Sequence, residues 1–305
     1  MRRAGWDLWL LTDIDGSYEA SPPTLIEHLK RDRRWCQGNL QHLRLLPARG
    51  LKLSSRIHLA FGAMSYLSSP LWLALIVVFT AHAIQMRFAA PVTYVGRYPV
   101  LIWPVSHVVA FVSLAVAAMT MLYLPKAMAV IVLLRDHKAA AQFGGRGRVI
   151  ASAVLESLLS TLLAPIYMLS HSWFVFNILI GRVTRWGAQL RSGDGTRFSA
   201  AISAFGPHTM IAILAGAAVW HFAPGVFLWY LPLLIGPAAA IPLAWAISKC
   251  RLGAAAGQAG LFLVPSETTR LAIVDRYETL LAASAASSPV VEKQISRDRG
   301  ALSTA

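Results

Sequence analysis

Three long stretches without a charged side chain dominate this sequence, at residues 57–86, 98–125 and 198–248. A helix needs roughly 20 apolar residues to cross the hydrocarbon core of a bilayer. The first two stretches therefore predict one membrane-spanning helix each, and the third is long enough for two. Hydrophobic residues make up 56% of the chain and charged residues only 14%. This composition is typical of an integral membrane protein and excludes an ordinary soluble domain.

A fourth apolar stretch, residues 149–181, is interrupted by Glu156 and Pro165. It can cross the membrane once, form a tight hairpin, or lie along the interface. Lysine and arginine are abundant in the remaining segments: ten in residues 1–58, five in 126–148, four in 182–200 and seven from residue 249 onward. Residues 88–125 contain only Arg97. Because short cytoplasmic loops collect basic residues, residues 149–181 are expected to return to the side that they left.

We therefore favour an interfacial helix or a hairpin for residues 149–181, with the C-terminus in the cytoplasm. Glu156 then either faces water at the interface or marks a pair or pathway at membrane depth. The formal net charge is +14, but the cations flank hydrophobic segments, where anionic lipid headgroups account for them better than nucleic acid does. Cys36 and Cys250 both lie in predicted cytoplasmic segments, so we expect no disulfide.

The chain divides into three predicted parts. Residues 1–56 are soluble, with a short buried strand at 6–11, a turn-rich segment at 13–23 and a basic helix at 24–46. Residues 57–248 form the transmembrane module, with cytoplasmic or interfacial segments. Residues 249–305 form a cytoplasmic tail, disordered from about residue 283. A doubly wound nucleotide-sugar domain needs several βα units, so the first 56 residues can hold only the end of one.

The basic helix carries the segment Leu-Lys-Arg-Asp-Arg-Arg-Trp-Cys-Gln-Gly-Asn at residues 29–39. Arginine side chains such as Arg31 and Arg34 can pair with phosphate oxygens through the planar guanidinium, and the indole of Trp35 offers a flat face on which a sugar ring can stack. The alternative is a juxtamembrane helix that binds lipid headgroups, with Trp35 as an interfacial anchor. For Arg33 this lipid interpretation is favoured.

This segment resembles the Q-x-x-R-W motif of processive family 2 glycosyltransferases, with Arg31 in the place of the glutamine. A closer resemblance, to the glucans biosynthesis glucosyltransferase H family, covers nearly the whole chain. It rests on blocks at residues 2–6, 16–19, 22–23, 31–36 and 64–68, and on the tripeptides at 124–126, 163–165 and 263–265. The N-terminal blocks are specific, whereas each tripeptide alone is weak.

The resemblance implies a multi-pass enzyme of the bacterial inner membrane that transfers glucose from UDP-glucose to a β-glucan backbone and passes the osmoregulated periplasmic glucan across the membrane. It implies substrate binding by Arg31, Arg34 and Trp35. A loop of Gly16, Ser17, Tyr18 and Glu19 either lies near the active site or is a plain turn. Membrane lipids and a periplasmic glucan-biosynthesis protein are the other implied partners, and nucleic acid is not one.

The family's catalytic base and its D-x-D motif, which holds Mg²⁺ or Mn²⁺ against the leaving UDP, would precede the residues present here. The chain is therefore expected to be the C-terminal part of a longer enzyme, with no catalytic residue and no metal ligand of its own, and inactive alone. Asp13 and Asp15 are interpreted as turn caps rather than metal ligands. The alternatives are a non-catalytic polytopic scaffold or conduit and, less favoured, a small-molecule permease.

Overall fold

The computed structural model describes residues 4–7, 9–10, 21–88, 92–101, 108–182, 195–265 and 272–287. The described chain is mainly helical, as the sequence predicts. It forms two compact units, Met1–Ala90 with Leu159–Lys249, and Pro91–Leu158 with Cys250–Ala305.

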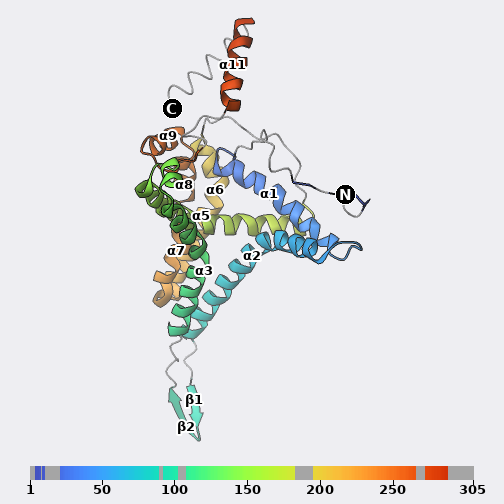
Figure 1. Ribbon diagram of the computed structural model, residues 1–305. Helices are drawn as coiled ribbons and strands as arrows, with labels where there is room; N and C mark the ends of the chain where they lie inside the picture. The colour runs from blue at the N-terminus through green and yellow to red at the C-terminus, as the bar shows by residue number, and fades with distance from the viewer. Residues whose placement is uncertain are drawn as a thin grey trace. The chain divides into compact units, whose positions relative to one another are not determined.

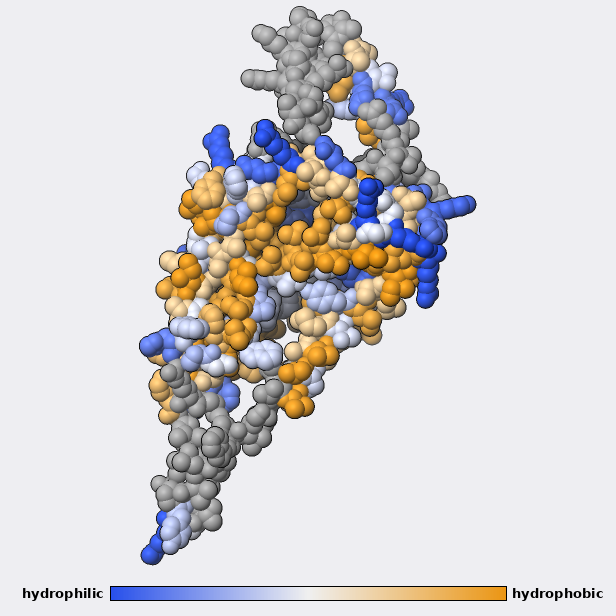
Figure 2. All heavy atoms as spheres, turned by 90° about the vertical axis from the view of Figure 1, so that its left-hand side faces the viewer, coloured by the Kyte–Doolittle hydropathy of each residue, from blue (hydrophilic) through white to orange (hydrophobic). Residues whose placement is uncertain are grey.

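Four helices are long and apolar enough to cross a membrane, and Figure 1 shows their course. They are α2 (Leu53–Phe88), α3 (Val108–Arg135), α5 (Arg146–Leu179) and α6 (Phe198–Phe222). A fifth span is formed if α7 (Phe227–Ala238) and α8 (Ala240–Ile247), which meet at a 52° bend, cross together. Apolar side chains cover much of the visible helix surface in Figure 2, as lipid contact requires. The predicted helical membrane module is confirmed.

The hairpin alternative for residues 149–181 is wrong, because α5 is one continuous helix. Pro165 lies inside it and is buried, together with Ile166. A proline in a membrane helix removes one backbone hydrogen bond but does not end the helix when neighbouring helices pack around it. At about 1.5 Å per residue, a 34-residue helix is longer than the roughly 30 Å hydrocarbon core.

The second predicted span begins and ends later than its charge boundaries suggest. We expected Lys126 to end it, but α3 continues through Pro125 and Lys126 to Arg135. The residues after Lys126 are apolar up to Leu134, so the helix keeps an apolar surface. The charge is accommodated because Lys126 Nζ pairs with Glu156 of α5 and donates to Ser157 Oγ at 3.2 Å. Glu156 is therefore paired while its side chain is 48% exposed, and its place at membrane depth or at the interface stays a prediction.

The short strands of the protein lie elsewhere than predicted. β1 (Val92–Val95) and β2 (Tyr98–Leu101) pair antiparallel, with Val95 opposite Tyr98 and Gly96 in the turn at φ 66°. In the predicted strand at residues 6–11, the described residues 6–7 and 9–10 are not in a strand, and residues 8 and 11 lie outside the described part. A strand needs a partner for its backbone groups, and no described residue pairs with this segment.

The first unit is organised around α1 (Leu25–His42), which is followed by the 3₁₀ turn η2 (Leu43–Leu45). In Figure 1, α1 lies along α5 and the first turns of α2. One apolar cluster joins Leu25 and Leu29 of α1 to α5, α6 and α8, and a second joins Cys36 and Leu40 to α2 and α5. A side chain on Gly236 of α7 would collide with the carbonyl of Leu162, so glycine allows α7 and α5 to touch. The predicted basic helix is confirmed, and it is part of the core.

The remaining elements are short. They are α4 (His137–Gln142), η3 (Pro224–Val226), α9 (Cys250–Gln258) and α11 (Ala272–Ser287). We expected disorder from about residue 283, but α11 continues to Ser287. Its last residues are mainly alanine, the strongest helix former, which explains why the helix extends beyond the predicted boundary.

Candidate functional site

The candidate site is built on α1, whose start is fixed by local signals. Thr24 is extended at the N-cap, and its Oγ1 accepts a hydrogen bond from the Glu27 backbone N–H at 3.3 Å. Glu27 adds a negative charge to the first turn, where the helix dipole favours it, and accepts from Lys30 Nζ at 2.7 Å. These contacts set where the helix begins, and therefore which side chains face the core.

One face of α1 is buried along its whole length. Leu25, Leu29, Asp32, Cys36 and Leu40 recur at intervals of three or four residues, so they form a single stripe. Four of these side chains are apolar or weakly polar, and the fifth, Asp32, is a carboxylate in the middle of the stripe. A buried charge is costly unless it is paired, so the surroundings of Asp32 determine how α1 is held.

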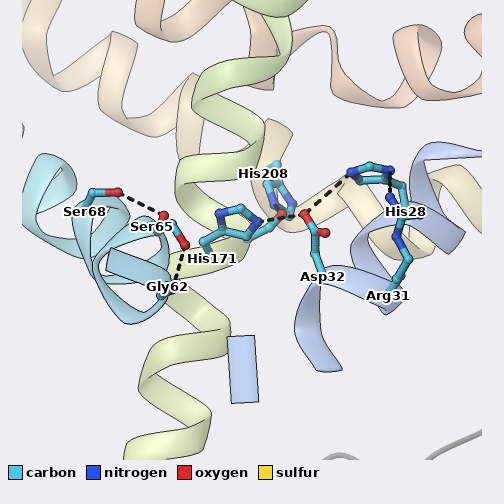
Figure 3. A network of polar contacts seen from close by, with 9 residues as sticks. His28, Arg31, Asp32, Gly62, Ser65, Ser68, His171 and His208 are labelled. Carbon is cyan, nitrogen blue, oxygen red and sulfur yellow. Dashed lines mark hydrogen bonds and ion pairs between the residues drawn. The ribbon is translucent and has the colours of Figure 1, made fainter. Parts of the chain in front are cut away.

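Two histidines contact Asp32 (Figure 3). His171 Nε2 of α5 lies 3.2 Å from Asp32 Oδ2, and His28 Nε2, one turn earlier on α1, lies 3.6 Å from the same oxygen. Arg31 Nη2 lies 3.3 Å from His28 Nδ1. A guanidinium can only donate, so His28 Nδ1 accepts this hydrogen bond and the ring proton of a neutral His28 is on Nε2, facing the carboxylate. The contacts thus connect α5, through Asp32 and His28, to Arg31.

Aromatic rings enclose the Asp32–His171 contact. The His171 ring lies 5.2 Å from the ring of Tyr66 in α2 and 5.6 Å from that of Tyr167 in α5. One turn beyond Asp32, the thiol of Cys36 is fully buried. Burial, and secondarily the charge of Asp32, raises the pKa of Cys36 from 9.0 to about 12. Cys36 therefore stays a neutral thiol at physiological pH and is a packing residue rather than a nucleophile.

The contact with α2 unites two blocks of the sequence that carry the family resemblance. Tyr66, in the block at residues 64–68, is buried in the same cluster as Cys36, in the block at residues 31–36. Gly62 allows this approach, because a side chain there would collide with Asn39 of α1. Ser65 and Ser68 donate to the carbonyls of Gly62 and Ser65 at 2.7 and 3.1 Å, so their hydroxyls are satisfied within α2 (Figure 3).

The predicted substrate-binding residues Arg31, Arg34 and Trp35 share the side of α1 away from this stripe. Trp35 is 48% exposed, and the Arg31 guanidinium carbon lies 4.6 Å from the centre of its ring. Such a cation–π contact holds the two side chains together at an exposed site. The structure thus brings together guanidinium groups and a flat, accessible indole, which are the groups needed to bind a phosphate and a sugar ring.

The other predicted site positions are separate from these three. Arg33 and Lys30 lie on a different side of α1, where both line a groove. Gly16, Ser17, Tyr18, Glu19, Asp13 and Asp15 lie outside the described residues. Within the described ranges, no three His, Cys, Asp or Glu side chains are close enough to hold a metal ion.

Known proteins are similar to most of this chain. The chain is 37% identical to a protein of Cupriavidus pinatubonensis, 39% to one of Pseudomonas putida and 37% to one of Shewanella baltica, in each case over 88% of its length. All three are named glucans biosynthesis glucosyltransferase H. These proteins are homologues of this chain. The resemblance to glucosyltransferase H inferred from the sequence is thereby confirmed.

The chain spans only about a third of the length of these glucosyltransferase H relatives, 31% of the first two and 37% of the third. The similarity therefore concerns one part of a larger protein. No protein-family model matches the chain. No solved structure matches it either.

Asp32, His171 and His28 are the residues that sequence reasoning missed. A signal was present for Asp32: it stands three residues after Leu29 and four before Cys36, on the stripe of core positions. Its partner 139 residues away could not be identified from spacing, because only the packing of α5 on α1 brings them together.

Proposed function

We propose that the chain is the acceptor-binding and membrane part of a glucosyltransferase that makes periplasmic glucans at the bacterial inner membrane. The observation that carries the proposal is its similarity, over 88% of its length, to proteins named glucans biosynthesis glucosyltransferase H. In this proposal UDP-glucose is the donor, and the hydroxyl of a growing β-glucan is the acceptor. A divalent metal and a catalytic base from the rest of the enzyme assist the transfer.

The roles proposed for α1 follow from its two sides. Arg31 and Arg34 bind the diphosphate of the donor, because guanidinium groups donate paired hydrogen bonds to phosphate oxygens. Trp35 stacks against the acceptor sugar. The buried stripe, anchored through Asp32 to His171, keeps these groups at a fixed place beside the membrane helices. A catalytic group needs such fixed positioning, since small misplacements lower the rate strongly.

A chimera tests the proposal. This chain would replace the matching third of the Pseudomonas putida glucosyltransferase H, in a strain that lacks its own glucan synthase. We expect the chimera to form glucan from radiolabelled UDP-glucose. Membranes that contain this chain alone should form none, because the proposed metal site and catalytic base are supplied by the rest of the enzyme.

Trp35→Ala in the chimera should lower glucan formation about tenfold or more, since a stacking platform for the acceptor is lost. The matched control is Trp220→Ala in α6, which removes another exposed indole far along the chain. Both variants should insert into the membrane equally well. Equal glucan formation by the two variants would mean that Trp35 is an interfacial anchor and not an acceptor-binding residue. An inactive unsubstituted chimera would contradict the proposed function itself.

A further inference from the structure

A large groove opens in the first unit beside α1. Its volume is about 890 Å³, within the range of roughly 300–1,000 Å³ that is usual for sites of small organic ligands. Residues of α1, α2, α5 and α6 line it. Most of them are apolar or aromatic, among them Leu73, Leu169, Trp173, Phe176 and Ile211. The walls therefore favour an apolar ligand.

Most polar atoms deep in this groove are already bonded within the protein. Ser170 Oγ lies 2.9 Å from His208 Nε2, and Ser172 Oγ donates to the carbonyl of Met168 at 2.7 Å. The other ring nitrogen of His208 is buried without a hydrogen-bond partner in the described part of the chain. The walls thus offer a ligand few polar contacts.

The α1 side of the groove is different, because it carries two cations. Lys30 and Arg33 stand three residues apart and both line the groove, and Lys30 is also paired with Glu27. Arg33 Nε is buried and has no hydrogen-bond partner among the described residues. Leaving a buried donor unsatisfied is destabilising, and more so when the group is charged. An anionic oxygen placed beside Arg33 would remove this cost.

A glucan fits these walls poorly. Its hydroxyls surround every sugar ring, and each one that lost water without finding a partner would weaken binding. A hydrocarbon chain has the opposite preference, because each methylene that leaves water strengthens binding. An apolar groove with a basic edge matches an amphiphile whose charged end is negative.

We propose that this groove binds an anionic phospholipid, with one acyl chain along the walls of α5 and α6 and the phosphate at Arg33 and Lys30. The lipid then fills the space between the helices that position α1. This site is distinct from the side of the helix that carries Arg31, Arg34 and Trp35. The inference does not depend on glucan transfer, so it stands or fails separately from the proposed function.

The test is lipid binding to the full chain in detergent micelles, followed by native mass spectrometry. Phosphatidylglycerol and phosphatidylcholine with the same acyl chains would be titrated separately. We expect one phosphatidylglycerol to be retained per chain, at least about fivefold more tightly than phosphatidylcholine, since a basic residue near an anionic headgroup contributes about 1 kcal/mol. Equal retention of the two lipids would overturn the proposal.

Two matched pairs of variants locate the site. Arg33→Gln should weaken phosphatidylglycerol binding about fivefold and leave phosphatidylcholine unchanged, whereas Arg44→Gln removes an exposed cation outside the groove and should change neither. Ile211→Ser should weaken both lipids about threefold. Ile202→Ser, on the same helix and equally exposed at 47%, lies outside the groove and should not.

Two results would contradict this site. If Arg33→Gln and Arg44→Gln bind phosphatidylglycerol equally, the basic edge does not hold the headgroup. If a linear glucan oligosaccharide displaces the lipid one for one, the groove binds the sugar chain rather than a lipid. Should Arg33→Gln fail to fold, Lys30→Gln tests the same headgroup contact, because the Lys30 side chain is 60% exposed.

Discussion

Asp32 with His171 in the first unit, and Lys126 with Glu156 in the second, each join two helices through an acid–base contact, but their surroundings differ. The side chains of Asp32 and His171 are 12% and 14% exposed and are enclosed by aromatic rings. Those of Lys126 and Glu156 are 35% and 48% exposed. Burial makes the first contact expensive to break, because an abandoned partner cannot be solvated by water.

The comparison shows that the position of a charged residue in the sequence does not reveal how strongly its contacts stabilise the fold. Glu156 interrupts an apolar stretch and attracts attention in the sequence, yet its carboxylate is half-exposed. Asp32 lies among arginines in a basic segment, where it looks like an ordinary surface residue, yet it forms the centre of the α1 core face. Substitutions at the two contacts distinguish a buried charge that holds helices together from an exposed one.

The largest effect concerns the membrane crossing of α5, since it decides whether Glu156 lies at membrane depth. Five crossings would put the tail on the side opposite to residues 1–56. The basic loops predict an even number, and a continuous α5 then has to lie along the interface. A fusion after Arg276 should give fluorescence with a cytoplasmic reporter and no activity with a periplasmic phosphatase. Phosphatase activity there would instead mean an odd number of crossings, which includes α5 if α7 and α8 cross together as one span.

Asp32→Ala should lower the free energy of unfolding by about 2–3 kcal/mol, because it deprives His171, whose side chain is only 14% exposed, of its partner. Unfolding by sodium dodecyl sulfate in mixed micelles measures this change. Asp136→Ala is the matched control: it removes an exposed aspartate that caps α4. That variant should lose about 1 kcal/mol. Equal losses of unfolding free energy in the two variants would mean that the Asp32–His171 contact stabilises the protein no more than an exposed helix cap does.

The burial of Cys36, one turn from Asp32, makes the stability of the protein depend on pH. Its pKa is about 12 in the folded protein and 9.0 normally. Above pH 9 the unfolded chain therefore releases a proton that the folded chain retains, and stability falls as the pH rises from 9 toward 12. The melting temperature should fall more between pH 8 and 10.5 in the unsubstituted chain than in Cys36→Ala. Identical slopes would show that the thiol is accessible to water.

The smallest effect is expected for the exposed pair. Glu156→Gln should destabilise the protein by only about 0.6 kcal/mol, the average for polar contacts between membrane helices, and the amide can still accept a hydrogen bond from Lys126. The same detergent titration measures it. A loss as large as that of Asp32→Ala would mean that lipid, not water, surrounds Glu156.

Much of the architecture follows from the sequence alone. The uncharged stretches at 57–86 and 198–248 correspond to α2 and to α6, α7 and α8, because the cost of burying backbone groups in lipid leaves few alternatives to a helix. The basic helix at 24–46 was also predictable, from its periodicity. So were the exposed indole of Trp35 and the adjacent Arg31, since residues four apart lie together on a helix.

Other features depend on contacts between distant residues, and these only the tertiary structure decided. The continuity of α5 through Pro165, the path of α3 past Lys126 and the burial of Asp32 each require a partner from another helix. The groove that holds Arg33 needs four helices to form its walls. Local sequence fixes which residues can be helical and which faces are apolar, whereas the pairing of charges and the shape of a cavity arise when those faces meet.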